Sequence, residues 1–136
     1  MKTLAFLKPG FSDAMTSVVE FVKFNQFTID EFMVYQFTIQ EADEFYKEHR
    51  SRDYHNRNIK YISSGPVLFF IIEGENVIAK WRDYLGPSDP TKARLTCPNS
   101  LRALYGIDLP RNVAHGSDSV NSAIREIEYI NNLIGE

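Results

Sequence analysis

The chain has 136 residues, of which 43% are hydrophobic, 24% charged and 13% aromatic. A chain of this length and composition can bury a core, which excludes an intrinsically disordered protein and predicts one domain over residues 1–136. The formal net charge is -3. No overall positive field therefore favours nonspecific binding to nucleic acid or to anionic lipid.

The sequence carries no sign of export or membrane insertion. Its single cysteine, Cys97, cannot form a disulfide within the chain. The apolar run before Pro9 is too short for a signal peptide, and no stretch has the length of a membrane span. We therefore expect a cytoplasmic protein with no membrane partner.

The N-terminal segment predicts a strand followed by a helix. Residues 3–8 form a short apolar stretch that Pro9 and Gly10 end, as is typical of a strand. Ser12 is a candidate N-cap for the helix that follows. That helix carries an apolar face made of Met15, Val18, Val19 and Val22.

Residues 27–63 predict a second strand and a helical hairpin. Within residues 27–39, apolar side chains recur on one side of an extended segment, with Glu31 as the exception on that side. Residues 40–63 show helical spacing, first around Ala42 and then around Ile59, so we expect two short helices.

A third strand and its helix follow. Residues 67–72 are apolar on both faces, as in a central strand, and the next segment has helical spacing of Val77, Ile78 and Trp81. Residues 86–98 contain three prolines without a clear period. We interpret them as a loop that is long enough to be functional.

The C-terminal segment completes an α+β pattern. A short helix over residues 100–105 precedes a strand or turn over residues 112–119. A long helix follows, with an apolar stripe of Val120, Ala123, Ile124, Ile127, Ile130 and Ile134. The order predicts a ferredoxin-like βαββαβ sandwich, in which a four-stranded antiparallel sheet carries helices on one face.

The motif NVAHGSDS at residues 112–119 is the strongest local signal. His115 stands just before the start of the long helix, where free N–H groups and the helix dipole favour an anion. Taken alone, a histidine in a turn is more often structural than catalytic, so the motif by itself leaves both roles open.

The motif resembles the active-site signature of nucleoside diphosphate kinases, and the resemblance extends over nearly the whole chain. Lys8 in LKPG resembles the lysine of the family's Lys-Pro-Asp motif. Tyr46 and Tyr54 fall in the predicted hairpin, where the family has an active-site tyrosine and an aromatic platform for the base. SSGPV at residues 63–67 is similar to the start of the family's central strand.

Further similarities surround the predicted loop. Arg82, Ser88 and the Asp-Pro pair after Ser88 resemble the arginine, hydroxyl residue and Asn-Pro before the family's long loop. Arg102 resembles the second arginine, and Glu126 the glutamate near the histidine. The family has no counterpart for His49 and His55, and we assign them no role.

The resemblance implies an enzyme that moves the terminal phosphate of a nucleoside triphosphate to a diphosphate through phospho-His115. In this interpretation Glu126 fixes the imidazole tautomer, and the base stacks on Tyr54 against Leu109. Lys8 and Asn112 then hold the sugar. The phosphates are held by Arg82, Ser88 and Arg102, with a further hydroxyl from Tyr46.

The chemistry explains these residue types independently of the resemblance. A neutral imidazole is a good nucleophile near neutral pH, and phosphoryl transfer is promoted mainly by positioning and positive charge. Magnesium is expected with the nucleotide, held mostly by phosphate oxygens and water, one of which Asp118 is placed to reach. The family also implies a homo-oligomer.

Three features depart from the commonest family pattern. Gly10 replaces the usual aspartate, the 86–98 segment is a few residues longer, and Asn58 stands where many members have a leucine beside the base. These departures resemble a divergent branch, which includes members with reduced or no kinase activity. The alternative is therefore a weakly active or inactive member that acts as a nucleotide-sensing or scaffolding module. A nucleic-acid-binding ferredoxin-like domain would need a basic sheet with exposed aromatics, which this acidic chain lacks.

Overall fold

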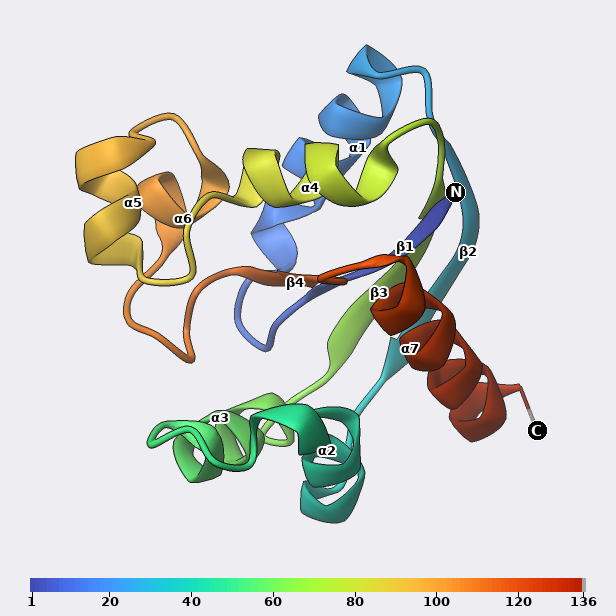
Figure 1. Cartoon of the computed structure of the whole chain (residues 1–136), viewed down its shortest axis with the longest axis vertical. Helices are drawn as coiled ribbons and strands as arrows, with labels where there is room; N and C mark the ends of the chain where they lie inside the picture. Colours follow the sequence, from blue (N-terminus) through green and yellow to red (C-terminus); the bar gives the residue numbers. More distant parts are fainter. Residues whose placement is uncertain (136) are drawn as a thin grey trace.

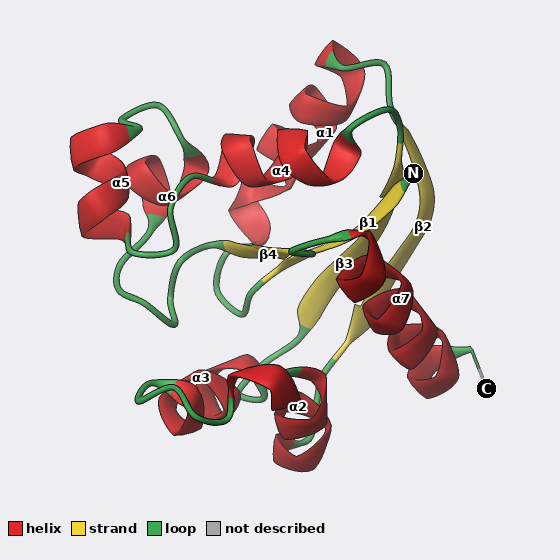
Figure 2. Ribbon diagram, in the orientation of Figure 1, coloured by secondary structure: helices red, strands yellow, loops and turns green. Residues whose placement is uncertain are grey.

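A computed structural model describes residues 1–135 and contains one four-stranded antiparallel sheet (Figures 1 and 2). Its strands lie in the order β2-β3-β1-β4. Their bounds are β1 Lys2–Leu7, β2 Thr28–Tyr35, β3 Val67–Glu73 and β4 Ala114–Gly116. The predicted α+β ferredoxin-like class is confirmed by this sheet with its packed helices.

Seven α-helices and two short 3-10 helices connect the strands within the described residues. The α-helices are α1 Met15–Phe24, α2 Ile39–Phe45, α3 His55–Ile62, α4 Val77–Leu85, α5 Pro90–Thr96, α6 Leu101–Tyr105 and α7 Val120–Ile134. The 3-10 helices are η1 Ser12–Ala14 and η2 Lys47–His49. None of the helices in this described part is long and apolar enough to cross a membrane.

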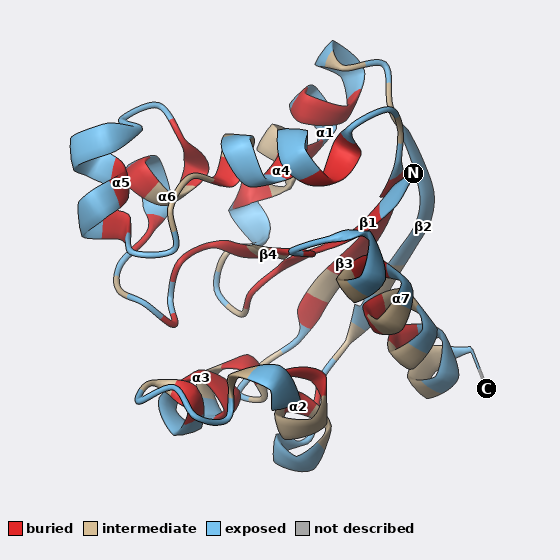
Figure 3. Cartoon of the chain, viewed as in Figure 1, coloured by how far each residue is buried: buried red, intermediate tan, exposed pale blue. Residues whose placement is uncertain are grey.

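Helices cover both faces of the sheet, which corrects the expectation of one covered face. Figure 3 shows buried positions along β1 and β3 between the two helical layers. On β1, Ala5 and Leu7 pack with α1 and α4, whereas Leu4 and Phe6 pack with α2, α3 and α7. Because the central strands are apolar on both sides, both sides must be shielded from water.

The predicted loop at residues 86–98 is wrong in one respect, because it contains helix α5. Asp89 caps this helix, since its Oδ1 accepts a hydrogen bond of 3.0 Å from the amide of Thr91. Pro90 occupies the first turn, where a missing N–H costs nothing. The prolines that suggested a loop therefore include one that starts a helix.

Two predicted helix and strand boundaries also differ. Ser12 begins η1 and makes no side-chain cap, so α1 starts only at Met15. The second strand ends at Tyr35, four residues before its predicted end, because Thr38 and Glu41 form a capping box that starts α2. Only part of the expected stripe on α7 is buried, since Val120 is 49% and Ile124 60% exposed.

Candidate active site

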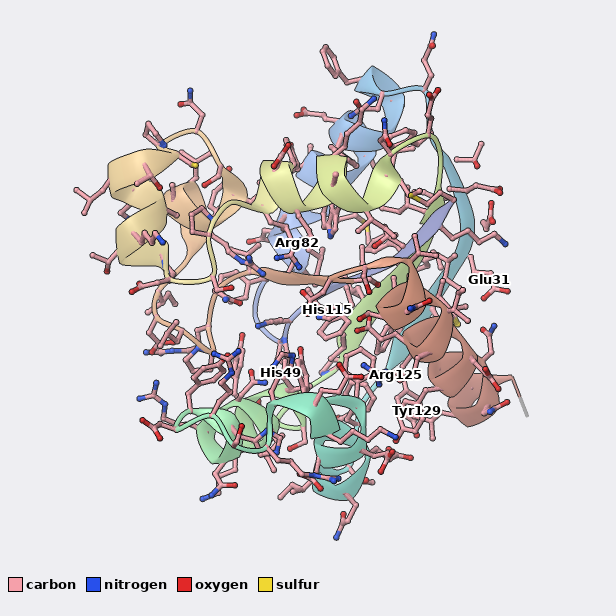
Figure 4. The ribbon with its side chains drawn as sticks, in the orientation of Figure 1. Glu31, His49, Arg82, His115, Arg125 and Tyr129 are labelled. Atoms are coloured by element: carbon pink, nitrogen blue, oxygen red, sulfur yellow. The ribbon has the colours of Figure 1, made fainter. Side chains whose placement is uncertain are left out.

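A cavity of about 430 Å³ lies between β4, the start of α7, the α2–α3 hairpin and the segment from α4 to α6. Figure 4 shows Arg82 and His115 on this side of the molecule, with His49 on the hairpin below them. Every predicted site residue lines this one cavity: Lys8, Tyr46, Tyr54, Arg82, Ser88, Arg102, Leu109, Asn112, His115 and Glu126. Residues far apart in the sequence thus meet in one place.

The sheet fixes the position of His115. Strand β4 pairs with β1 so that His115 lies opposite Phe6, and the two rings stack at 4.8 Å between centroids. The indole N–H of Trp81 donates to the backbone oxygen of His115 at 3.0 Å. A Cβ on Gly116 would lie 2.6 Å from the Trp81 ring, so only glycine permits this close approach beside His115.

A buried carboxylate orients the His115 ring. Oε1 of Glu126 lies 2.8 Å from Nε2 of His115 and also accepts a 2.8 Å hydrogen bond from the Ser117 hydroxyl. Burial would raise the pKa of Glu126, but the neighbouring His115 and Ser117 outweigh burial and lower it. An ionised Glu126 accepts a proton from Nε2–H, which leaves Nδ1 of His115 as the free nitrogen.

The backbone two residues before His115 is strained. Val113 has a φ of 80°, and the amide of Ala114 donates to the oxygen of Asn112 at 3.0 Å, which makes a γ-turn of the rare positive-φ type. The oxygen of Val113 accepts a 2.9 Å bond from the amide of Lys8. A β-branched residue in this conformation costs of order 1 to 3 kcal/mol, and such strain is found mostly at functional sites.

Lys8 and Asn112 form a buried polar pair at the end of β1. The Lys8 ammonium donates to Oδ1 of Asn112 at 2.6 Å and to the oxygen of Pro110 at 3.3 Å. The Asn112 amide donates in turn to the oxygen of Ser88 at 2.8 Å. Burial first, and then the nearby Arg102, lower the pKa of Lys8 well below its ordinary value. An anion in the cavity would relieve the cost of keeping this lysine charged.

Arg102 holds three chain segments together beside the cavity. Its guanidinium donates to the oxygen of Asn112 at 3.1 Å, of Gly86 at 2.9 Å and of Ala114 at 2.7 Å. Burial lowers the pKa of Arg102 to about 10. Five N–H groups are present and three are used, so donors remain for a ligand.

The mouth of the cavity is more exposed than the part around His115. Arg82 donates to the carboxylate of Asp118 across the mouth, and the two side chains are 48% and 57% exposed. Tyr54 and Leu109 are also partly or fully exposed. These side chains are accessible to an incoming ligand.

Two polar side chains of the hairpin are buried at the inner end of the cavity. Asn58 is buried, and the hydroxyl of Tyr46 is buried without a hydrogen-bond partner. Burial, and then the Glu126 carboxylate, raise the pKa of Tyr46, so it stays a neutral donor. The Tyr46 and His115 rings lie edge to face at 6.0 Å. The unpartnered hydroxyl therefore remains available as a hydrogen-bond donor in the cavity that His115 also lines.

Several residues of the site were not expected from the sequence. Ser117 lies inside the histidine motif, but only the fold shows that it contacts Glu126. Glu48, His49 and Arg125 also line the cavity. His55 instead contacts Asp43 at 2.8 Å, outside the cavity lining.

The cavity is lined by an imidazole with a free ring nitrogen, by the four cationic side chains Lys8, Arg82, Arg102 and Arg125, and by several hydrogen-bond donors. This combination is suited to phosphate groups beside a histidine. No group of three or more metal-binding side chains occurs among the described residues. The carboxylate of Asp118 lies at the cavity, which fits a metal ion carried mainly by phosphate oxygens and water.

Comparison with known proteins gives the same class. The family model for nucleoside diphosphate kinase matches residues 1–132. The nucleoside diphosphate kinase of Aquifex aeolicus is 37% identical over 131 residues, covering 95% of this chain and 92% of that protein. An orthorhombic crystal structure of the Aquifex aeolicus enzyme superposes with a TM-score of 0.87 over 95% of this chain and 93% of its own.

Two eukaryotic relatives are also similar. "Probable nucleoside diphosphate kinase 5" of Arabidopsis thaliana is 43% identical over 103 residues, covering 76% of this chain and 72% of that protein. "Nucleoside diphosphate kinase homolog 7" of Rattus norvegicus is 39% identical over 127 residues, covering 93% of this chain but only 32% of that protein. This chain belongs to the nucleoside diphosphate kinase family.

Proposed function

We propose that the protein is a nucleoside diphosphate kinase that works by a ping-pong mechanism through phospho-His115. The observation that carries the proposal is the contact between Glu126 and Nε2 of His115. It leaves Nδ1 as a free nucleophile in a cavity that Lys8, Arg82 and Arg102 line. The cost of burying Lys8 and Arg102 supports an anionic ligand, because an anion would repay it.

In the first half-reaction, Nδ1 of His115 attacks the γ-phosphorus of a nucleoside triphosphate. The N–P bond forms as the bond to the β–γ bridging oxygen breaks, and the nucleoside diphosphate leaves with that oxygen and its electron pair. Glu126 stabilises the positive charge that develops on the ring. A second nucleoside diphosphate then attacks phospho-His115 through its terminal oxygen, which reverses the step and regenerates the imidazole.

The cationic side chains stabilise negative charge on the phosphates. Arg82 and Arg102 donate to phosphate oxygens, and the hydroxyls of Tyr46 and Ser88 add further donors. Magnesium bound to the nucleotide would neutralise phosphate charge, with Asp118 as the side chain available to one of its waters. Binding of a phosphate near Arg82 competes with its ion pair to Asp118.

The sugar and base are proposed to lie toward the hairpin. Lys8 and Asn112 hydrogen-bond the sugar, and Tyr54 stacks on the base opposite Leu109. A homo-oligomer is also proposed, and its support here is the exposed outer strand β2, where Phe32 is 47% and Val34 55% exposed. Light scattering in solution measures this state directly.

Labelled ATP with magnesium tests the function. We expect the wild-type protein to acquire a protein-bound phosphate that is acid-labile and base-stable, and to lose it to any added nucleoside diphosphate. His115→Ala should keep the fold and lose the label. His49→Ala, which removes another histidine of the cavity, should keep it. An unlabelled wild-type protein would instead support the nucleotide-sensing alternative.

A further inference from the structure

Arg125 on α7 connects the α2–α3 hairpin with the carboxylate of Glu126. No other described ion pair joins the hairpin to α7. Its Nε lies 3.1 Å from Oε1 of Glu48 at η2, and its Nη2 lies 3.7 Å from Oε2 of Glu126. In Figure 4, Arg125 extends from α7 towards the α2–α3 hairpin, close to His115. One guanidinium thus contacts both the hairpin and the carboxylate that orients the histidine.

The two oxygens of Glu126 are used differently. Oε1 takes both the His115 and the Ser117 contacts, whereas Arg125 is the charged neighbour of Oε2. Glu126 is 6% exposed and Arg125 is 30% exposed at the side chain. Because burial alone would favour a neutral Glu126, a cation on its second oxygen helps to keep it ionised.

We propose that Arg125 is a positioning residue, which acts through Glu126 to hold the His115 imidazole in the tautomer that leaves Nδ1 free. This inference rests on the proposed function. Glu48 modulates the effect, because it shares the guanidinium and draws positive charge away from Glu126. The hairpin that carries Tyr46 and Asn58 is thereby linked electrostatically to the attacking nitrogen.

Other charged and titratable groups face the same pair and must be held constant. Beyond Arg125, those that line the cavity are Lys8, Tyr46, Glu48, His49, Tyr54, Arg82, Asp83, Cys97, Arg102 and Asp118. None of them contacts Oε2 of Glu126 within the described ion pairs. The variants below change only Arg125 or Glu48.

The sign of the effect is fixed by Coulomb's law. Arg125→Gln removes a cation and so favours the protonated form of Glu126. A protonated carboxyl no longer needs the proton of Nε2–H, so the tautomer that leaves Nδ1 free should be less populated as the pH falls. Glu48→Gln removes an anion and releases Arg125 towards Glu126, so the pKa of Glu126 should fall further. Arg125→Lys should stay close to wild type.

The experiment combines nitrogen NMR of the His115 ring, which distinguishes its two neutral tautomers, with single-turnover phosphorylation by MgATP across pH. The acid limb of the rate profile should lie at higher pH in Arg125→Gln than in wild type. At a pH on that limb, Arg125→Gln should be about three- to tenfold slower than wild type, with little loss on the plateau. Glu48→Gln should be as fast as wild type or faster on the same limb.

Three results would overturn the inference. One is an unchanged tautomer population of His115 in Arg125→Gln. Another is an acid limb that moves in the same direction in Arg125→Gln and Glu48→Gln. The third is a raised KM for ATP with an unmoved acid limb, which would make Arg125 a phosphate ligand. The proposed function fails separately, if wild-type His115 takes no phosphate from MgATP while its ring signals still respond to the variants.

Discussion

The inner end and the mouth of the cavity are built differently. At the inner end, His115 and Glu126 are 13% and 6% exposed at the side chain and are held by buried hydrogen bonds. At the mouth, Arg82 and Asp118 are about half exposed and are held mainly by each other. The His115 ring is thus oriented without any ligand, whereas the exposed groups would have to exchange partners for a ligand that binds between them.

The inner end and the mouth should differ most in the loss of kcat/KM and of thermal stability that follows removal of an arginine. Arg102→Ala should lower kcat/KM by about ten- to a thousandfold, because a charge donor is lost and three carbonyl oxygens lose their partner. Arg102→Lys should also have a lower kcat/KM, since an ammonium group cannot reproduce the planar set of donors of a guanidinium. Steady-state kinetics and thermal melting of each variant measure the two losses.

Arg82→Ala is the matched variant at the mouth. It removes an equal charge without breaking a buried network, so its melting temperature should stay close to wild type. If Arg102→Ala kept half of the wild-type kcat/KM, Arg102 would stabilise the fold without contributing to catalysis. The proposed catalytic difference between the two regions would then be lost.

The next effect concerns the orientation of the imidazole. Glu126→Gln keeps the shape of the side chain but can offer its amide nitrogen to His115, which favours the wrong tautomer. Losing a hydrogen bond to a charged group is worth about 1.5 to 3 kcal/mol, so we expect a rate about ten- to a hundredfold lower in single-turnover phosphorylation. An unchanged rate would show that the protein does not need Glu126 to orient His115.

The same carboxylate gives a pH dependence of stability. The pKa of Glu126 in the folded protein lies below its ordinary value of 4.5, so the ionised form is favoured by folding. Its contribution is present above pH 4.5 and is lost as the pH falls through the lowered pKa. The difference in unfolding free energy between wild type and Glu126→Gln should therefore shrink on acidification. Denaturant titrations on both sides of this range check the sign.

The strained turn before His115 allows a smaller test of preorganisation. Val113→Gly and Val113→Ala both remove the buried side chain, but only glycine adopts a φ of 80° without strain. Relief of strain stabilises the glycine variant, whereas the greater entropy of its unfolded state destabilises it. The glycine variant should therefore have an unfolding free energy equal to that of the alanine variant or higher by up to about 1 kcal/mol. A less stable glycine variant would mean that the turn stores no strain.

The smallest effect is expected for base selection. In the proposed function the base stacks on Tyr54, which accepts every base, and Asn58 is the nearby polar side chain that could read a base edge. A neutral hydrogen bond is worth about 0.5 to 1.5 kcal/mol, so kcat/KM for ATP, GTP, CTP and TTP should differ by roughly two- to twelvefold. Asn58→Leu should reduce this bias. A spread above about a hundredfold would require a base-reading pocket.

The sequence predicted the strands and the hairpin, because these follow from local periodicity. The site residues that it predicted came from the family resemblance around the His115 motif, whereas Glu48, His49 and Arg125 were not predicted. Helix α5 was not predicted, because a proline can either end a helix or occupy its first turn, and the sequence around Pro90 did not distinguish the two. The second layer of helices was missed although β1 and β3 are apolar on both faces. The strain at Val113 and the contacts of Ser117 and Arg125 depend on tertiary neighbours, which no local pattern encodes.

The hydroxyl of Ser117 links Glu126 to the backbone of β1, because it accepts a 3.1 Å hydrogen bond from the amide of Leu4. That amide belongs to a central strand, yet its partner is a side chain of the active site. Its rate of hydrogen exchange therefore depends on whether the Glu126 network is closed. The Leu4 amide is a natural, label-free reporter, and its exchange should slow when phosphorylation or nucleotide binding tightens the site.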